Sequence, residues 1–376
     1  MKILFLTKYS QRGGSSRYMV HNMLDMYKQA GINYRVAPLF DDRYFDFQLL
    51  DRPTNVRDIL SHLGYFVART LRRLSDVMMS SRYDLVVFEK ELLPYVPFGI
   101  EQVLKLRGTP SVVLFDDATY SYYRNHSFAI IRMLCRNKIE QVIGCADHVI
   151  VWNRTLERYA QGLNRNVSAV NTAIDIARYR VKSYCGASDS AQRPIVIGWI
   201  GTPNSFPFIR SLERVFADLA LRYDVELRII SSQEYTSSNI RVANHPWSLA
   251  SEVDELLAFD IGIMPLPNTE WAAGKSGVKA LQYMAVGVPA VCSPVGMNAD
   301  VILDGENGML ARDEREWVAK LSMLIENREL RARIGLAGRR TVEHGYTKDA
   351  VGARLIEIFR QIGRSNDTVR VSGHAA

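Results

Sequence analysis

A lysine inside a partial phosphate-binding pattern lies in the segment WAAGKSGVKALQYMAVGVPAV, residues 271–291. Its Gly274, Lys275 and Ser276 match the last three residues of the phosphate loop of nucleotide triphosphatases. A complete loop, G-x-x-x-x-G-K-[ST], begins with another glycine, so that successive backbone N–H groups surround a phosphate chain. That position is Thr269 here, and no glycine lies between it and the Gly-Lys pair. An ATPase or regulatory switch is therefore the least favoured hypothesis for this lysine.

The spacing of the lysines indicates a different anion site. Lys275 and Lys279 lie four residues apart, so they share one face of a helix that begins at Ser276. Ser276 is of a type that caps such a helix, and first-turn N–H groups such as that of Gly277 then point outward. A strand predicted at 260–266 brings them to the carboxyl edge of a sheet. The pattern predicts a diphosphate site made of a helix N-terminus and ammonium groups.

Two consecutive carboxylates, Asp116 and Asp117, follow a strand predicted at 111–115, so at least one of them should face a cleft. One hypothesis gives them acceptor binding or help with the proton of an acceptor hydroxyl. The alternative is an N-cap for the helix that follows Ala118. Both remain open. No third ligand is visible nearby, so no metal site is predicted.

A glycine-rich loop, QRGGSS, follows the first predicted strand and contains Gly13, Gly14 and Ser15. Glycines let the backbone turn and approach a ligand closely. The loop lacks the G-x-G-x-x-G dinucleotide pattern because Ser16 stands in it, and no acidic residue ends the second predicted strand. A dehydrogenase is disfavoured, and the loop is predicted to contact the acceptor or a phosphate.

Apolar runs rich in Val and Ile alternate with helical patterns along the chain, which is typical of parallel sheets covered by helices on both faces. The predicted strands are residues 2–7, 34–39, 84–88, 111–115, 148–153 and 167–171, and then 195–200, 225–231, 240–244, 260–266, 289–293 and 308–311. The segment 175–194 between the two sets suits a linker. The predicted fold class is α/β, with two Rossmann-like doubly wound parallel-sheet domains facing across a cleft, residues 1–174 and 195–347. Ligands of such sheets bind at the carboxyl ends of the strands.

The composition is that of a soluble globular protein, with 47% hydrophobic and 23% charged residues and no apolar run long enough to cross a bilayer. We expect a cytoplasmic protein. The cysteines have neither disulfide nor zinc spacing; they are Cys135, Cys145, Cys185 and Cys292. A net charge of +7 raises nucleic acid as a partner, but no nucleic-acid motif accompanies it.

An amphipathic helix with several arginines is predicted at residues 57–82. One hypothesis is peripheral contact with an anionic membrane, at its inner face. The favoured alternative is an ordinary domain helix with a solvated basic face.

Longer segments resemble a known family. The stretch from Asp260 to Ala311, DIGIMPLPNTEWAAGKSGVKALQYMAVGVPAVCSPVGMNADVILDGENGMLA, is similar to the donor-binding half of the large retaining glycosyltransferase family of GT-B fold, glycosyl transferases group 1. PIVIGWIGTP, HPWS and GRRTVEHGYT in the second half, with DLVVFEKELLP, VVLFDDATY and ADHVIVWN in the first, resemble a bacterial polysaccharide-type subgroup. The resemblance covers residues 1–360.

The resemblance implies transfer of a sugar from a nucleotide diphosphate sugar, with UDP, GDP or dTDP as the nucleotide, to an acceptor. Retention at the anomeric carbon and no required metal or other cofactor are implied as well. The acceptor is a glycan, a lipid-linked molecule or a small molecule, bound on the first domain near Gly13 and Gly14. The setting is cell-surface polysaccharide or glycoconjugate biosynthesis. The C-terminal helix, 348–364, is expected to return to the first domain, and 365–376 to form a mobile tail.

The donor site is expected on the second domain, where the chain departs from the family pattern. The family often has two glutamates eight positions apart, and Gly274 and Gln282 stand there. The Gln282 amide can still bond to ribose hydroxyls. The family also often has Arg and Lys after the first strand of this domain, and their charge is expected to come from Lys275 and Lys279. The predicted donor-binding residues are Gly201, Thr202, Glu270, Trp271, Gly274, Lys275, Ser276, Gly277, Lys279 and Gln282, and the predicted catalytic residues are Asp116, Asp117 and Lys275.

Two further hypotheses follow from the changed glutamate positions and the two-domain architecture. The first is a catalytically silent sugar-nucleotide binding protein, which differs from an enzyme in turnover and not in binding. The second is a nucleotide-sugar epimerase, which needs no acceptor.

Overall fold

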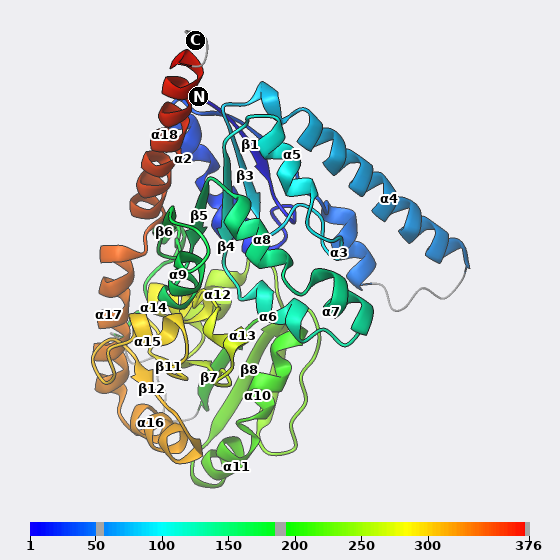
Figure 1. Ribbon diagram of the computed structural model, residues 1–376. Helices are drawn as coiled ribbons and strands as arrows, with labels where there is room; N and C mark the ends of the chain where they lie inside the picture. Colours follow the sequence, from blue (N-terminus) through cyan, green and yellow to red (C-terminus); the bar gives the residue numbers. More distant parts are fainter. Residues whose placement is uncertain (50–55, 185–192, 373–376) are drawn as a thin grey trace. The chain divides into compact units, whose positions relative to one another are not determined.

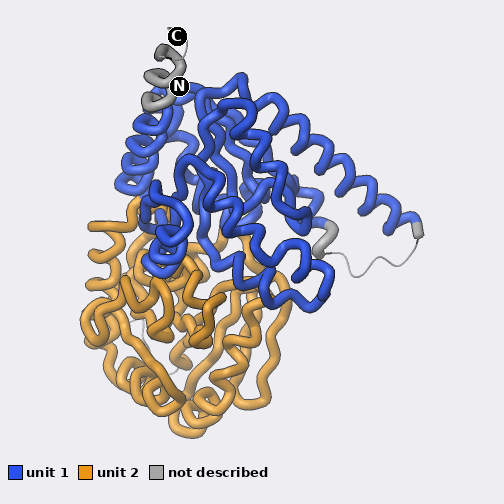
Figure 2. Tube along the Cα trace, in the orientation of Figure 1, with its two compact units in different colours: residues 1–173, 348–376 blue, residues 174–347 orange. Residues whose placement is uncertain are grey.

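The computed structural model describes residues 1–49, 56–184 and 193–372, and it divides the chain into two compact units. Unit 1 comprises residues 1–173 and 348–376, and unit 2 comprises residues 174–347 (Figure 2). Part of the predicted linker, residues 185–192, lies outside the described ranges. The described part of that segment belongs to unit 2, where the Tyr179 hydroxyl donates a 3.0 Å hydrogen bond to Glu252. Lys182 donates to the carbonyl oxygens of Leu257 and Phe259.

Unit 1 contains a six-stranded sheet in the order β2-β1-β3-β4-β5-β6, in which every paired neighbour is parallel. Its central strands β3 and β4 are buried along their whole length, which is why they are continuous apolar runs in the sequence. The strands are β1 (Lys2–Leu6), β2 (Asn33–Val36), β3 (Leu85–Glu89), β4 (Ser111–Phe115), β5 (His148–Val151) and β6 (Val167–Ala169).

Helices of unit 1 cover this sheet (Figure 1). They are α1 (Gly14–Met19), η1 (His21–Met23), α2 (Leu24–Gln29), α3 (Asp42–Leu49), α4 (Val56–Met78), η2 (Ser80–Arg82), α5 (Ile100–Leu106), α6 (Thr119–Arg124), α7 (Ala129–Cys135), α8 (Lys138–Cys145), α9 (Arg154–Gln161) and α18 (Lys348–Ser372). The C-terminal helix α18 packs on unit 1, where the Phe359 ring lies 6.0 Å from that of Phe5 and 5.8 Å from that of Tyr27. It continues to Ser372, so the tail predicted to be mobile from residue 365 begins as helix, and residues 373–376 lie outside the described part.

Helix α4 turns part of its basic face toward the sheet, whereas the favoured prediction placed that face in solvent. Arg73 is buried and donates to the carbonyl oxygen of Thr7, and Arg69 donates to that of Leu39. Tyr65 and Val77 of α4 are buried, but many of its large apolar side chains are exposed; they include Ile59, Leu60, Leu63, Phe66, Val67 and Leu71. These hydrogen bonds fix the basic face of α4 against the backbone near the sheet. Each bond satisfies a guanidinium donor and a carbonyl acceptor together. The prediction of a solvated basic face is therefore wrong for these two arginines.

Unit 2 contains the second six-stranded sheet, in the order β12-β11-β10-β7-β8-β9, again with parallel pairs throughout. The strands are β7 (Ile195–Ile200), β8 (Val225–Ser231), β9 (Arg241–Pro246), β10 (Ile261–Met264), β11 (Ala290–Cys292) and β12 (Met309–Leu310). The helices are η3 (Ile176–Arg178), η4 (Pro203–Ser205), α10 (Phe206–Arg210), α11 (Glu213–Arg222), α12 (Glu252–Leu257), α13 (Glu270–Ala273), α14 (Val278–Ala285), α15 (Met297–Val301), α16 (Glu314–Glu326) and α17 (Arg328–Gly345).

One tyrosine fixes α14 on this sheet. The Tyr283 ring lies against Gly262 of β10 so closely that a Cβ there would be 2.4 Å from the ring. Its hydroxyl donates to the carbonyl oxygen of Ile263 and accepts from the N–H of Ile200, each at 3.2 Å. Because the side chain is fully buried and bonded to two strands, it holds the lysine-bearing start of α14 at a defined place.

Candidate functional site

The chain enters α14 through two short turns. Thr269 caps α13 by accepting the N–H of Ala272, and Gly277 precedes the first residue of α14. Gly277 has φ of 66°, a left-handed conformation that glycine adopts without strain. The helix thus begins later than predicted, and no side chain caps it. The predicted N-cap at Ser276 is wrong, because the left-handed turn occupies the following residue.

The two lysines reach this turn from different elements. Lys279 belongs to the first turn of α14, and Lys275 lies in the segment before it, so they do not share one helix face as predicted. The Lys275 Nζ lies 4.9 Å from the centroid of the Trp271 ring, and the Lys279 Nζ lies 4.7 Å from that of Trp199. Each ammonium group therefore rests against an indole.

Gly201 makes room for Lys279 at the end of β7. A Cβ at this position would lie 2.7 Å from Lys279 Cε and 2.6 Å from the Trp199 ring. The structure thus brings together predicted residues that are far apart in the sequence, with the ammonium group of Lys279 beside the loop that begins at Gly201. Thr202 and Glu270 are both exposed.

Gln282, which was predicted to reach a ribose, is buried in the second turn of α14. Its Nε2 donates a 3.3 Å hydrogen bond to the hydroxyl of Tyr179, which in turn donates to Glu252. Gly274, the other changed glutamate position, is also buried. A part of the site that the sequence analysis missed is the segment before α15. A Cβ at Gly296 would lie 2.5 Å from the Ala273 carbonyl oxygen, so this segment packs tightly on the lysine-bearing turn.

In unit 1 the two predicted aspartates bind a lysine that the sequence analysis missed. Lys90, just after β3, places its Nζ 2.8 Å from Asp116 Oδ1 and 3.0 Å from Asp117 Oδ2. Ala118 is the N-cap of α6 and no side chain caps that helix, so the capping alternative is wrong. Burial alone would lower the pKa of Lys90, but the two carboxylates outweigh it and raise the pKa above its ordinary value.

A buried carboxyl lies beside this ion pair, at the end of β3. Glu89 Oε2 accepts hydrogen bonds from the Ser16 hydroxyl at 2.6 Å and from the N–H of Lys8 at 2.8 Å. Glu89 Oε1 has no hydrogen-bond partner among the described residues. Burial, with a smaller contribution from Asp116, raises the pKa of Glu89 to about 7. The sequence signal was the run Glu89-Lys90-Glu91, three charges directly after an apolar strand.

The glycine-rich loop, predicted to contact the acceptor or a phosphate, leads into α1. Gly13 is buried, and a Cβ there would lie 2.4 Å from the Tyr9 Cβ. The Tyr9 side chain therefore explains why this position is a glycine. Gly14 and Ser15 begin α1, and a Cβ on Gly14 would meet nothing within 4 Å. The residue of this loop that contacts the charged cluster, which consists of Glu89, Lys90, Asp116 and Asp117, is Ser16.

Glu89 makes the stability of unit 1 depend on pH. Its raised pKa means that, between the ordinary value of 4.5 and about 7, the folded state keeps a proton that the unfolded chain has lost. The unfolding free energy should therefore fall with rising pH across this window, by about 1.4 kcal/mol per pH unit for this group. We expect the unfolding free energy of Glu89→Gln, relative to that of the wild type, to rise by roughly 2–3 kcal/mol between pH 5 and pH 8. Urea denaturation at each pH measures this difference. Parallel pH profiles of the two proteins would contradict the assignment, and the exposed Asp46→Asn variant is the control.

Sequence comparison connects unit 2 to a family. Residues 195–327 match the model of the family described as Glycosyl transferases group 1. The match covers all six strands of unit 2, from β7 to β12. A relative with a shorter match is the spore coat protein SA of Bacillus subtilis (strain 168), which is 28% identical over 83 residues, 21% of this chain and 22% of that protein.

Solved structures match nearly the whole chain. Sucrose-phosphate synthase from Thermosynechococcus elongatus has a TM-score of 0.69 at 14% identity, covering 97% of this chain and 100% of that one. Anabaena HepE in complex with UDP-glucose has a TM-score of 0.67 at 14% identity, covering 96% and 100%. The fold is GT-B, with two Rossmann-like units, and the predicted fold class is confirmed. The family that the sequence resembles is the one whose model matches residues 195–327.

No helix among residues 1–49, 56–184 and 193–372 has the length and apolar character needed to cross a membrane. In the same ranges no group of three or more His, Cys, Asp or Glu side chains is arranged to hold a metal ion.

Proposed function

We propose that this protein is a retaining glycosyltransferase that moves a sugar from a nucleotide diphosphate sugar to an acceptor hydroxyl without a metal ion. The family match of unit 2 and the GT-B fold support sugar transfer. The observation that carries the proposal is the pair of lysines at the start of α14, inside the matched residues. Bacterial cell-surface polysaccharide or glycoconjugate synthesis in the cytoplasm is the proposed setting.

Residues 195–347 of unit 2 are proposed to bind the donor. A nucleoside diphosphate leaves with more negative charge than it carries in the donor, so fixed positive groups beside it lower the barrier. Lys279 supplies such a charge next to Gly201, where the family often has its own basic residues. Lys275 and the first-turn N–H groups of α14 supply the rest. The other predicted contacts, Thr202, Glu270, Trp271 and Ser276 among them, remain part of this proposal.

Unit 1 is proposed to bind the acceptor with the carboxylates beside Lys90. Its Nζ lies 2.8 Å from Asp116 and 3.0 Å from Asp117, so the ammonium group holds both carboxylates beside it. Asp117 has the more exposed side chain, at 20% against 9% for Asp116, so Asp117 is the proposed contact with the acceptor hydroxyl. Lys90 and Asp116 then act as positioning groups that keep this carboxylate in place.

A catalytically silent binding protein and an epimerase are the alternatives. Gly274 has no side chain where the family often has a carboxylate, and the Gln282 amide is bonded to Tyr179, which favours the silent alternative if turnover fails. An epimerase would convert the donor with no acceptor present, so analysis of the products separates it from a transferase.

The test is a screen of the purified full chain against UDP-, GDP- and dTDP-sugars, first without added metal and then with Mg²⁺. We expect one nucleotide sugar to raise the melting temperature and to release its nucleoside diphosphate slowly by transfer to water, because excess ligand stabilises the folded state that binds it. UDP-glucose is the first donor to test, given the complex of Anabaena HepE. Binding without turnover under any acceptor would favour the silent protein, and failure of every nucleotide sugar to bind would reject the proposal.

A further inference from the structure

A cluster of large apolar side chains on unit 1 is exposed around α7. Met133 is 72% exposed and Phe128 is 66% exposed, and Ile130 and Leu134 are also more than half exposed. Single exposed apolar residues are common, but several on one short helix form a patch that marks an interaction site. The α7 patch consists of Tyr95, Val96, Tyr122, Phe128, Ile130, Met133 and Leu134.

Aromatic contacts make the patch continuous with the loops of the proposed acceptor site. The Tyr95 and Tyr122 hydroxyls lie 2.9 Å apart. The His126 ring lies 5.9 Å from the Tyr95 ring, 5.2 Å from the Tyr122 ring and 5.6 Å from the Phe128 ring. Tyr95 follows β3 on the segment that carries Lys90, and Tyr122 lies on α6, just after the two aspartates. Whatever covers the patch therefore lies next to the charged cluster.

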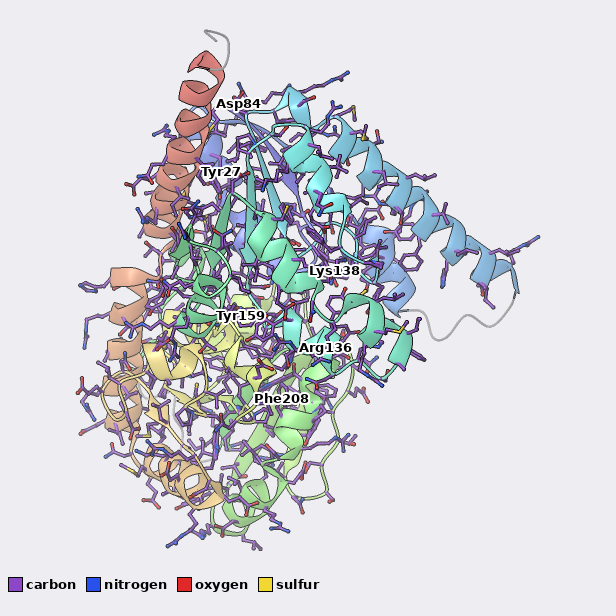
Figure 3. All side chains as sticks on the ribbon, in the orientation of Figure 1. Tyr27, Asp84, Arg136, Lys138, Tyr159 and Phe208 are labelled. Atoms are coloured by element: carbon purple, nitrogen blue, oxygen red, sulfur yellow. The ribbon has the colours of Figure 1, made fainter. Side chains whose placement is uncertain are left out.

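The segment that carries most of the patch has positive charges alone. Residues 127–137 contain Arg132 and Arg136 and no acidic residue. Arg136, at the end of α7, is exposed and is labelled in Figure 3. Apolar side chains flanked by arginines, with tyrosines at the edge, are the combination that suits the boundary between anionic headgroups and acyl chains.

A second exposed apolar surface on the same unit agrees with this chemistry. The α4 stripe consists of Ile59, Leu60, Leu63, Phe66, Val67 and Leu71, and Leu60 is 61% exposed. The exposed residues of α4 also include Arg57 and Arg72. Ring contacts join this stripe to α3, since Phe66 lies 5.7 Å from Phe40, which stacks on Tyr44 at 4.7 Å. In Figure 1, α4 runs outward past the other helices of unit 1.

We propose that the α7 patch seats unit 1 on an anionic lipid surface. Its apolar side chains enter the interfacial region while Arg132 and Arg136 meet the phosphates. The acceptor is then a lipid-linked molecule, because the acceptor loops adjoin the membrane-bound patch. This statement about the acceptor rests on the proposed function.

The test is flotation of the full chain with vesicles of phosphatidylglycerol and phosphatidylcholine, or of phosphatidylcholine alone. We expect the protein to bind the anionic vesicles, with binding that weakens as salt increases. Met133→Glu should lower the affinity at least about tenfold, since a carboxylate replaces an inserted apolar side chain. Phe128→Ser should weaken binding to a lesser degree. Leu221→Glu on α11 of unit 2 is the matched control, because Leu221 is 87% exposed outside the patch.

Equal binding by the wild type and Met133→Glu, or no binding of the wild type to anionic vesicles, would overturn the proposal. A dimer that Met133→Glu dissociates, with no vesicle binding, would assign the patch to a second copy of the chain and overturn it as well. Nucleotide-sugar binding is measured on the same samples. Vesicle binding without nucleotide-sugar binding would reject the proposed function alone, and the converse would reject the lipid proposal alone.

Discussion

Lys279→Ala should lower turnover about 100-fold or more, with little loss of stability. The ammonium group lies beside Gly201 and the start of α14, where the charge of a leaving diphosphate would grow. Removing one preorganised group that stabilises transition-state charge costs about 100- to 1,000-fold in other enzymes. Lys275→Ala should have an effect of the same order, because its ammonium group belongs to the same turn.

The measurement is kcat/KM for the nucleotide sugar that the screen identifies, together with the dissociation constant of the nucleoside diphosphate. Lys320→Ala is the matched control, because Lys320 is a lysine of the same unit that lies on α16 and not on α14. Its Nζ lies 2.8 Å from Asp304 Oδ2. A larger fall in turnover than in diphosphate affinity would indicate that the charge acts mainly in the transition state. Wild-type turnover in both Lys279→Ala and Lys275→Ala would remove these residues from the site.

The central strands were predictable because they are buried on both faces, and a strand covered by helices on both sides must be apolar along its length. Each of the twelve predicted strands has a counterpart, from Lys2–Leu6 to Met309–Leu310. The end of β4 placed Asp116 and Asp117 for the same reason. A strand end is visible in the sequence where the apolar run stops.

Partners across strands were not predictable. Lys90 meets Asp116 and Asp117 only because β3 and β4 are neighbours, and no local pattern fixes that order. The α4 prediction failed for a related reason. Periodicity identifies two faces of a helix, but the carbonyl oxygens of Thr7 and Leu39, far away in the sequence, decide which face turns inward. The Ser276 cap failed because a single left-handed residue, Gly277, resets the helix start.

Lys138→Met should destabilise unit 1 by about 3–5 kcal/mol, the usual result of removing one partner from a buried ion pair. Lys138 begins α8 (Figure 3), and its Nζ lies 2.7 Å from Glu91 Oε2, with both side chains almost fully buried. The ammonium group also donates to the Leu93 carbonyl oxygen. Without it, the partner left to the Glu91 carboxylate among the described residues is the Tyr123 hydroxyl, 2.8 Å from each oxygen, and that donor cannot compensate a buried negative charge.

Lys138 and Glu91 should therefore couple in a double-mutant cycle followed by urea denaturation. Glu91→Gln in the Lys138→Met background should recover most of the loss, because a neutral amide replaces the uncompensated carboxylate. Arg12→Met is the control within unit 1, since the Arg12–Asp46 pair is exposed and such pairs contribute little. If the double variant were as unstable as Lys138→Met, the loss would come from packing around α8 and not from the buried charge. Recovery would instead identify the Glu91–Lys138 pair as the link that fixes the loop bearing Lys90 and Tyr95 onto α8.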